Sequence, residues 1–168
     1  PTQRSYEAAL YPVEESYLLQ QQLAQAETDS AYRTGESVYR QWVYDHYLTV
    51  PQDTYDALTA QFTPGQGWNT TQAKTEISRF LAANLTLREG PVTPATGDGA
   101  AWLLTGARQG YSVHYATLTT LLLRCCGIPA RYVEGYVVTR QQAEALSDGA
   151  QLTLTQRAAH AWAEYYLD

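Results

Sequence analysis

The sequence contains no methionine, only two cysteines, two phenylalanines and a single lysine, Lys74. The absence of Met, with Pro1 at the first position, leads us to expect a fragment or a processed piece of a longer polypeptide. No apolar run approaches the roughly 20 residues that a membrane-spanning helix needs, and no secretory segment stands at the amino end. We therefore expect this piece to be soluble, although its parent protein could be anchored in a membrane elsewhere.

Positive charge is also scarce. Lys and Arg together number 11 against 17 Asp and Glu, which gives a formal net charge of −6 and a pI near 5.0. Phosphate binding needs clustered basic side chains, and the arginines here are isolated along the chain. The composition therefore argues against nucleic acid as a partner.

The two cysteines, Cys125 and Cys126, are neighbours, so no second pair exists to form a disulfide framework or a metal site. We interpret them as small apolar side chains of a helix, with a vicinal disulfide as the alternative. No cluster of carboxylates, histidines and cysteines occurs at a spacing suited to a metal. We therefore expect neither a metal nor a cofactor.

Helical patterns dominate the chain as far as Cys126, and 45% of the 168 residues are hydrophobic, enough for one core. We expect a turn over Thr28–Gly35 and extended chain over Leu85–Pro94. The predicted helices are Tyr6–Ala26, interrupted by Pro12; Ser37–Tyr47; one through Leu58–Phe62, capped by Gln52–Thr54; one opened by Asn69–Thr71; a short one after Gly97–Gly99; and Ser112–Cys126.

Strand-like patterns follow the last helix. Tyr132–Val138 and Trp162–Leu167 are rich in β-branched and aromatic residues, and Gln151–Thr155 is a possible short strand. Helices that precede strands in this way predict an α+β fold, with the helices packed on one side of a mostly antiparallel sheet.

Ser112 and His160 are the candidate reactive residues. Ser112 stands at a helix start, where free amides and the helix dipole favour an anion, and Gly110 would allow a sharp turn before it. Alternation places His160 on one strand face with Trp162 and Glu164. A nucleophile and its base usually come from different elements. The simpler alternatives are a helix N-cap for Ser112 and an ordinary half-buried strand histidine for His160.

Three blocks then carry a specific resemblance: Gly110–Ala116, Leu122–Tyr136 with its Leu-Leu-Arg, Gly-Ile-Pro-Ala-Arg and Gly-Tyr groups, and His160–Glu164. Together they resemble the core of the transglutaminase-like superfamily, which has a papain-like fold. Similarity begins near Tyr44, so the resemblance implies a core over 44–168 and a helical flanking segment over 1–43.

The family uses a Cys-His-Asp triad. The resemblance places Ser112 at the nucleophilic cysteine position and His160 at the general base. A serine hydroxyl is a much poorer nucleophile than a thiolate. The family's acid lies on a strand after the histidine strand, so we expect the third acid to be absent from this chain and Asp168 to stand too close to His160. We then also expect the sheet to be incomplete at its carboxyl end.

Other polar residues allow additional interpretations. We read His114 as structural, or as lying at the rim of the site. Arg124 and Arg131 could bind an anion, but salt bridges with Glu134 or helix-end capping are the simpler expectation. Glu134 and Glu164 could be proposed as a glycosidase carboxylate pair, but nothing around them supports this, and solvated strand residues are the better interpretation.

The resemblance implies a thiol acyl-transfer domain that acts on peptide or glutamine amides, at the surface of a bacterial cell or outside it. With serine at residue 112, we expect the chain to be inactive, whether the change is natural or engineered. The alternatives are a non-catalytic module that binds peptide or cell wall, and a cysteine peptidase or amidase of the same fold.

Overall fold

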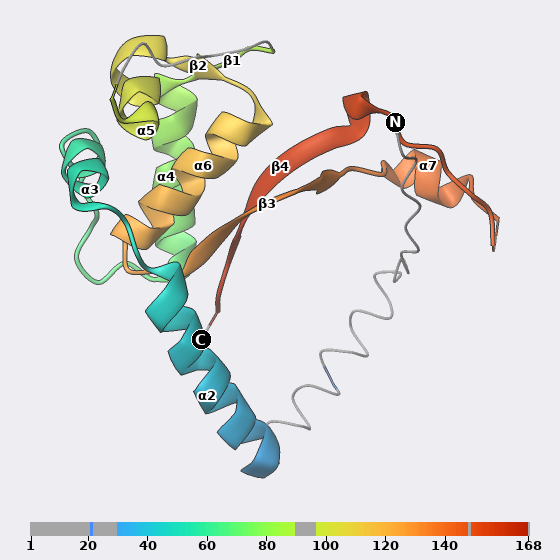
Figure 1. Cartoon of the computed structure of the whole chain (residues 1–168), viewed down its shortest axis with the longest axis horizontal. Coiled ribbons are helices and arrows are strands. Elements are labelled where there is room, and N and C mark those ends of the chain that lie inside the picture. Colours follow the sequence, from blue (N-terminus) through green and yellow to red (C-terminus); the bar gives the residue numbers. More distant parts are fainter. Residues whose placement is uncertain (1–20, 22–29, 90–96, 148, 168) are drawn as a thin grey trace. The chain divides into compact units, whose positions relative to one another are not determined.

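The computed structural model describes residues 21, 30–89, 97–147 and 149–167 (Figure 1). The chain separates into two compact units, Pro1–Trp42 and Val43–Asp168. Apart from Gln21, the predicted helix over Tyr6–Ala26 lies outside the described residues. Within the part of the chain that the structure describes, no helix has the length and apolar character needed to cross a membrane.

Helix α2 (Ser30–Tyr47) crosses the boundary between the two units. It ends before Pro51, as predicted, but begins seven residues earlier than Ser37, so the turn predicted for this stretch is wrong from Ser30 onward. One glycine in an exposed helix costs only about 1 kcal/mol, and Gly35 takes no positive φ. In the first unit, the rings of Tyr39 and Trp42 stack with centroids 6.2 Å apart.

Two helices on either side of a Pro-Gly turn follow: α3 (Gln52–Thr59) and α4 (Thr70–Asn84). Asn69 caps α4 as predicted, because its side chain accepts the Gln72 N–H at 2.9 Å while the Gln72 side chain accepts the Asn69 N–H at 3.0 Å. The predicted capping of α3 by its first residues is wrong, since its N-cap is Pro51, which provides no side-chain acceptor.

A short helix and a π-helical turn come next: α5 (Gly99–Trp102) and η1 (Leu103–Ala107). Asp98 caps α5 by accepting from the backbone N–H groups of Ala100 and Ala101 at 2.8 and 3.0 Å. Strand β1 (Thr86–Leu87) pairs in parallel with β2 (Gln109–Gly110), which leads directly into the next helix.

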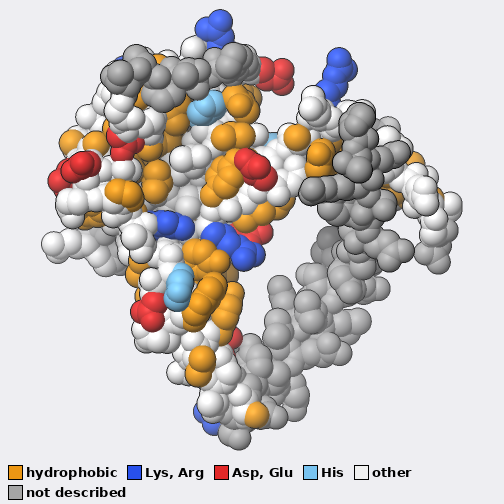
Figure 2. All heavy atoms as spheres, viewed as in Figure 1, with side chains coloured by type: hydrophobic (Ala, Val, Ile, Leu, Met, Phe, Trp, Pro, Cys, Tyr) orange, Lys and Arg blue, Asp and Glu red, His pale blue; other side chains and the backbone are white. Residues whose placement is uncertain are grey.

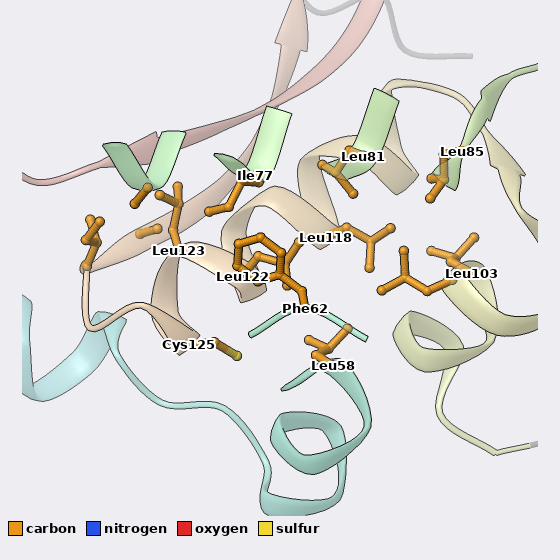
Figure 3. Close-up of a cluster of buried hydrophobic side chains, with 14 residues drawn as sticks. Leu58, Phe62, Ile77, Leu81, Leu85, Leu103, Leu118, Leu122, Leu123 and Cys125 are labelled. Atoms are coloured by element: carbon orange, nitrogen blue, oxygen red, sulfur yellow. The ribbon is translucent and has the colours of Figure 1, made fainter. Parts of the chain in front are cut away.

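Helix α6 (Ser112–Cys125) lies at the centre of the core. Its apolar face packs against α3, α4 and α5, and Leu118 and Leu122 are fully buried. Figure 3 shows the buried cluster, with labelled side chains Leu58, Phe62, Ile77, Leu81, Leu85, Leu103, Leu118, Leu122, Leu123 and Cys125.

Strands β3 (Ala130–Tyr136) and β4 (Ala159–Tyr165) form an antiparallel pair. Ala130 faces Tyr165 at one end of the ladder, and Gly135 faces His160 near the other. α6 packs on both strands, and the paired positions Ala130 and Tyr165 contact the helical core (Figure 1). The predicted α+β arrangement, with helices on one side of an antiparallel sheet, is therefore confirmed.

The connection between β3 and β4 differs from the prediction. Residues 151–155 form no strand, because an isolated extended segment has no neighbour to accept and donate its backbone hydrogen bonds. The structure instead contains a short helix, α7 (Arg140–Glu144), and a 3-10 turn, η2 (Gln156–Ala158). Thr139 and Gln142 form a capping box at the start of α7, and this Thr-x-x-Gln spacing is visible in the sequence.

Candidate active site

Ser112 is the first residue of α6 and is half-buried. The N-cap is the preceding residue, Tyr111, whose backbone is extended at φ −122° and ψ −170°. The N-cap interpretation of Ser112 is therefore wrong by one position. Ser112 stands in the first helical turn, where backbone N–H groups have no partner within the helix.

His114 closes this helix start. The backbone N–H of Tyr111 donates to His114 Nδ1 at 3.2 Å, and the two rings meet edge to face with centroids 4.5 Å apart. A Cβ on Gly110 would lie 2.7 Å from His114 Cβ, so glycine is needed here for space. Gly110 has no positive φ, so its backbone does not need glycine for a sharp turn. The close approach of His114 explains the glycine instead. The structural reading of His114 agrees with these contacts.

His160 is the second residue of β4, and its side chain is exposed. Ala161 is 4% exposed and Ala163 packs against the core, so alternation places His160 and Trp162 on the opposite face of the strand. α6 packs along β4, and both begin at the same end (Figure 1). Among the described residues, no hydrogen bond joins Ser112 to His160. The structure thus places the two residues on neighbouring elements, with His160 on the face of β4 turned away from the helical core.

A polar network occupies the sheet face that carries His160. Arg131 Nη2 lies 2.6 Å from Glu164 Oε2, and Trp162 Nε1–H donates to Glu164 Oε1 at 3.1 Å. A Cβ on Gly135 would lie 2.8 Å from the Trp162 ring, so this glycine makes room for the indole. Hydrogen bonds from Arg131 and Trp162 hold the pKa of Glu164 below its ordinary value.

The proposed carboxylate pair does not form. Glu134 lies opposite Ala161 in the ladder and Glu164 lies opposite Arg131, so the two carboxylates belong to opposite faces of the sheet. The salt bridges expected with Glu134 are wrong as well, because Arg131 pairs with Glu164.

The other expectation, capping of a helix end, is wrong for Arg124, because its hydrogen bonds go to carbonyls outside the helices. At the last turn of α6 it donates from Nε to the carbonyl of Ala130 at 2.8 Å and from Nη1 to that of Thr49 at 2.9 Å. Burial lowers the pKa of this guanidinium.

Glu134 has a different partner, which the sequence did not indicate. The Tyr132 hydroxyl donates a short hydrogen bond to Glu134 Oε1. Burial, followed by this hydrogen bond and the charge of Glu134, raises the pKa of Tyr132 to about 12, and Tyr111 contributes to the same shift. The sequence signal was the two-residue spacing on one strand, which puts both side chains on one face. Their proximity to the start of α6 depends on the packing of β3.

Neither thiol can act as a nucleophile at neutral pH. Burial raises the pKa values of Cys125 and Cys126 to about 11. Both cysteines are free, so the vicinal disulfide does not form. Across 30–89, 97–147 and 149–167, no group of three or more His, Cys, Asp or Glu side chains could hold a metal. Asp168 lies outside the described residues.

Two proteins of known sequence align with parts of the chain. A protein-glutamine gamma-glutamyltransferase of Pseudomonas aeruginosa is 45% identical over 74 residues, which cover 44% of this chain and 10% of that protein. The protein YebA of Bacillus subtilis, itself uncharacterized, is 34% identical over 59 residues, or 35% of this chain and 8% of YebA. The chain therefore spans a small part of the length of these relatives.

Solved structures share the fold. The periplasmic domain of TgpA from Pseudomonas aeruginosa bound to ethylmercury superposes with a TM-score of 0.53 at 24% identity, covering 76% of this chain and 45% of that one. A second structure of the same domain gives 0.50 at 24% identity, covering 76% and 43%.

The sequence model of the transglutaminase-like superfamily matches residues 56–168. This match covers more than half of the chain and includes α6, β3 and β4. The chain belongs to the transglutaminase-like superfamily.

Proposed function

We propose that the chain is a domain of the thiol acyl-transfer class that acts on peptide or glutamine amides. Ser112 occupies the position of the nucleophile, and His160 occupies that of the general base. The observation that carries this proposal is the family match over 56–168, which spans both residues. The packing of α6 on β4, with their amino ends on the same side, supports it. The name of the Pseudomonas aeruginosa relative supports glutamine as the amide.

The proposed reaction begins with attack of the residue 112 side chain on the amide carbonyl. His160 takes the proton of the nucleophile and then delivers it to the leaving amine, and an amine or water resolves the acyl intermediate. As a hypothesis, the backbone N–H of Ser112 stabilises the oxyanion. Among the described residues no hydrogen bond joins Ser112 to His160, and the imidazole lies on the face of β4 opposite the buried Ala161, so the proposed proton transfer requires the start of β4 to change conformation when substrate binds.

The chemistry of Ser112 makes the chain a weak catalyst or an inactive one. A helix start and a nearby imidazole can lower the pKa of a thiol enough to form a thiolate. They do not ionise a serine hydroxyl in this way. The buried thiols of Cys125 and Cys126, with pKa values of about 11, do not replace it. Whether the serine is natural or engineered is decided by the encoding gene.

The proposal also assigns location and boundaries. We propose residues 44–168 as the core and 1–43 as a flanking helical segment. The titles of the similar structures describe a periplasmic domain, which supports a position outside the cytoplasm of a bacterial cell.

The test is amine incorporation into a glutamine peptide by the protein and by its Ser112→Cys variant. We expect turnover only in the cysteine form, and loss of about 10²–10⁴-fold of it when His160→Gln is added. Equal and substantial turnover by the serine form would refute the nucleophile assignment.

A non-catalytic peptide-binding module is the second candidate, and Ser112 itself favours it. In that case the serine protein and Ser112→Cys bind the peptide equally and neither turns it over. A cysteine peptidase or amidase would instead give hydrolysis in Ser112→Cys without incorporation of the amine.

A further inference from the structure

Tyr132 and Glu134 share the face of β3 that is turned toward α6. Their cross-strand partners in β4 are Ala163 and Ala161. Ala161 is buried and Ala163 packs against the helical core, so these four positions lie on the helix side of the sheet. Because both of these partners are alanines, no large side chain of β4 stands directly opposite Tyr132 or Glu134 in the ladder.

The start of α6 adjoins this pair. Tyr111, immediately before Ser112, lies close enough to act electrostatically on the Tyr132 hydroxyl. Tyr111 and Tyr132 are half-buried, while Glu134 is exposed. In Figure 2, acidic atoms lie among hydrophobic atoms over the region of α6 and β3. A carboxylate is thus open to solvent beside two tyrosines and the candidate nucleophile position.

Glu134 forms no ion pair among the described residues, unlike three other glutamates. Glu76, Glu144 and Glu164 each form an ion pair with an arginine. Glu134 receives one hydrogen bond, from the phenol of Tyr132, whose raised pKa keeps it a donor. An ionised carboxylate offers about four acceptor positions, so most of its capacity remains free.

This combination suits a positively charged group. A carboxylate accepts strong charge-assisted hydrogen bonds from an ammonium or guanidinium, and tyrosine faces attract cations electrostatically. The Tyr132 hydroxyl fixes the carboxylate rotamer, which lowers the entropy lost on binding.

We propose that Glu134, with Tyr132 and Tyr111, forms a subsite for a cationic group beside Ser112. The position of this subsite relative to a reacting amide rests on the proposed function. The bound cation is a primary ammonium or a guanidinium. It has two possible sources, the free amine that resolves the acyl intermediate or a basic side chain next to the glutamine of the donor peptide.

The first test is binding to the protein as it stands, measured by NMR titration with butylamine and with 1-butanol as its neutral counterpart. We expect butylamine to shift the signals of Tyr111 and Glu134, and Glu134→Gln to weaken its binding about tenfold without changing that of the alcohol. Binding should also weaken as salt increases. Glu164→Gln is the matched control, because it makes the same charge change on the opposite face of the sheet.

A second arm separates the two sources. Glutamine peptides carrying Lys or Ala beside the glutamine are compared: a donor-peptide subsite favours the Lys peptide about tenfold and loses this preference in Glu134→Gln, whereas an amine subsite binds both peptides equally. The two outcomes together identify the source.

Equal binding of butylamine by the wild type and Glu134→Gln, or salt-independent binding by the wild type, overturns the subsite. Tyr132→Phe provides a second variant if Glu134→Gln fails to fold, and unchanged binding in it overturns the role of the hydroxyl. No step of this test requires acyl transfer. A catalytically inert Ser112→Cys that still shows Glu134-dependent binding refutes the proposed function alone.

Discussion

Gly110 is required by a neighbouring side chain and not by its own backbone dihedrals. Among the glycines, Gly67, Gly97, Gly127 and Gly149 have positive φ, and Gly110 does not. Its Cα lies against His114, whose Nδ1 accepts the Tyr111 N–H. Sequence alone indicates that a glycine before a helix matters, but the reason depends on the rotamer of a residue four positions later.

Replacement of Gly110 by alanine tests this contact. The new Cβ would lie 2.7 Å from His114 Cβ and 2.9 Å from Cγ, so the imidazole must move and release the Tyr111 N–H. We expect Gly110→Ala to lower the free energy of unfolding by about 1–3 kcal/mol, measured by urea denaturation. In a His114→Gly background, which removes both the Cβ and the Cγ, the same change should cost much less. Equal costs in both backgrounds would show that the two residues are not coupled.

The contacts around the two candidate residues were harder to predict than the elements that carry these residues. Ser112 and His160 follow from the local motifs, and the structure places them on adjoining elements. The assignment of Arg131 to Glu134 was wrong because it depends on strand register. The strand register places Arg131 opposite Glu164, and Glu134 accepts a hydrogen bond from the Tyr132 hydroxyl instead.

At the level of elements, accuracy depended on how many independent signals agreed. Leucine periodicity and a terminal glycine predicted α6 to within one residue at its end. α2 was predicted too short because polar residues around one glycine resemble a turn. The strand predicted for Gln151–Thr155 was wrong, since an extended segment is stable only when a neighbour pairs with it.

The cap of α5 gives a pH-dependent prediction. Burial acts to raise the pKa of Asp98, but hydrogen bonds from the Thr54 hydroxyl and from the N–H groups of Ala101 and Ala100 outweigh it and hold the pKa below its ordinary value of 3.8. A carboxyl with a lower pKa in the folded state stabilises the fold above the unfolded value. That stability is lost as the pH falls through the folded value.

We therefore expect Asp98→Asn to be less stable than the wild type at pH 7, with the difference shrinking as the pH falls from about 4 toward 2. Asparagine keeps one oxygen to accept from the N–H groups of Ala100 and Ala101, but it places an NH2 group where the Thr54 hydroxyl now donates, so the charge and that hydrogen bond are removed together. Asp98→Ala should cost about 1 kcal/mol even where the carboxyl is protonated. Thermal unfolding of the three proteins across this pH range checks the result. A difference between wild type and Asn that stays constant with pH would contradict the cap assignment.

At the scale of the second unit, one half-buried cation, Arg124, links segments that are distant in the sequence. Arg124 stands at the end of α6, and none of the ion pairs of the described residues includes it. Instead, its guanidinium donates to the carbonyl of Thr49, after α2, and to that of Ala130, the first residue of β3. The order of helices and strands predicted the fold class. It did not predict this link, because the carbonyls of Thr49 and Ala130 meet only after folding.

Replacement of Arg124 by methionine should therefore destabilise the whole unit. Methionine keeps an unbranched apolar stem but leaves two carbonyls without their charged donor. Ala130 is buried, so the loss at its carbonyl costs about 1–3 kcal/mol, whereas water can replace the donor at the exposed Thr49. We expect a decrease of about 1–3 kcal/mol in the free energy of unfolding by urea, with one transition retained. Arg79→Met is the control, because Arg79 is 69% exposed and pairs with Glu76 at the surface, where an ion pair contributes about 0–1 kcal/mol. Arg124→Lys should fall between the two, since an ammonium lacks the planar fork that reaches both carbonyls. If Arg124→Met proves no more harmful than Arg79→Met, the guanidinium is not what joins these segments.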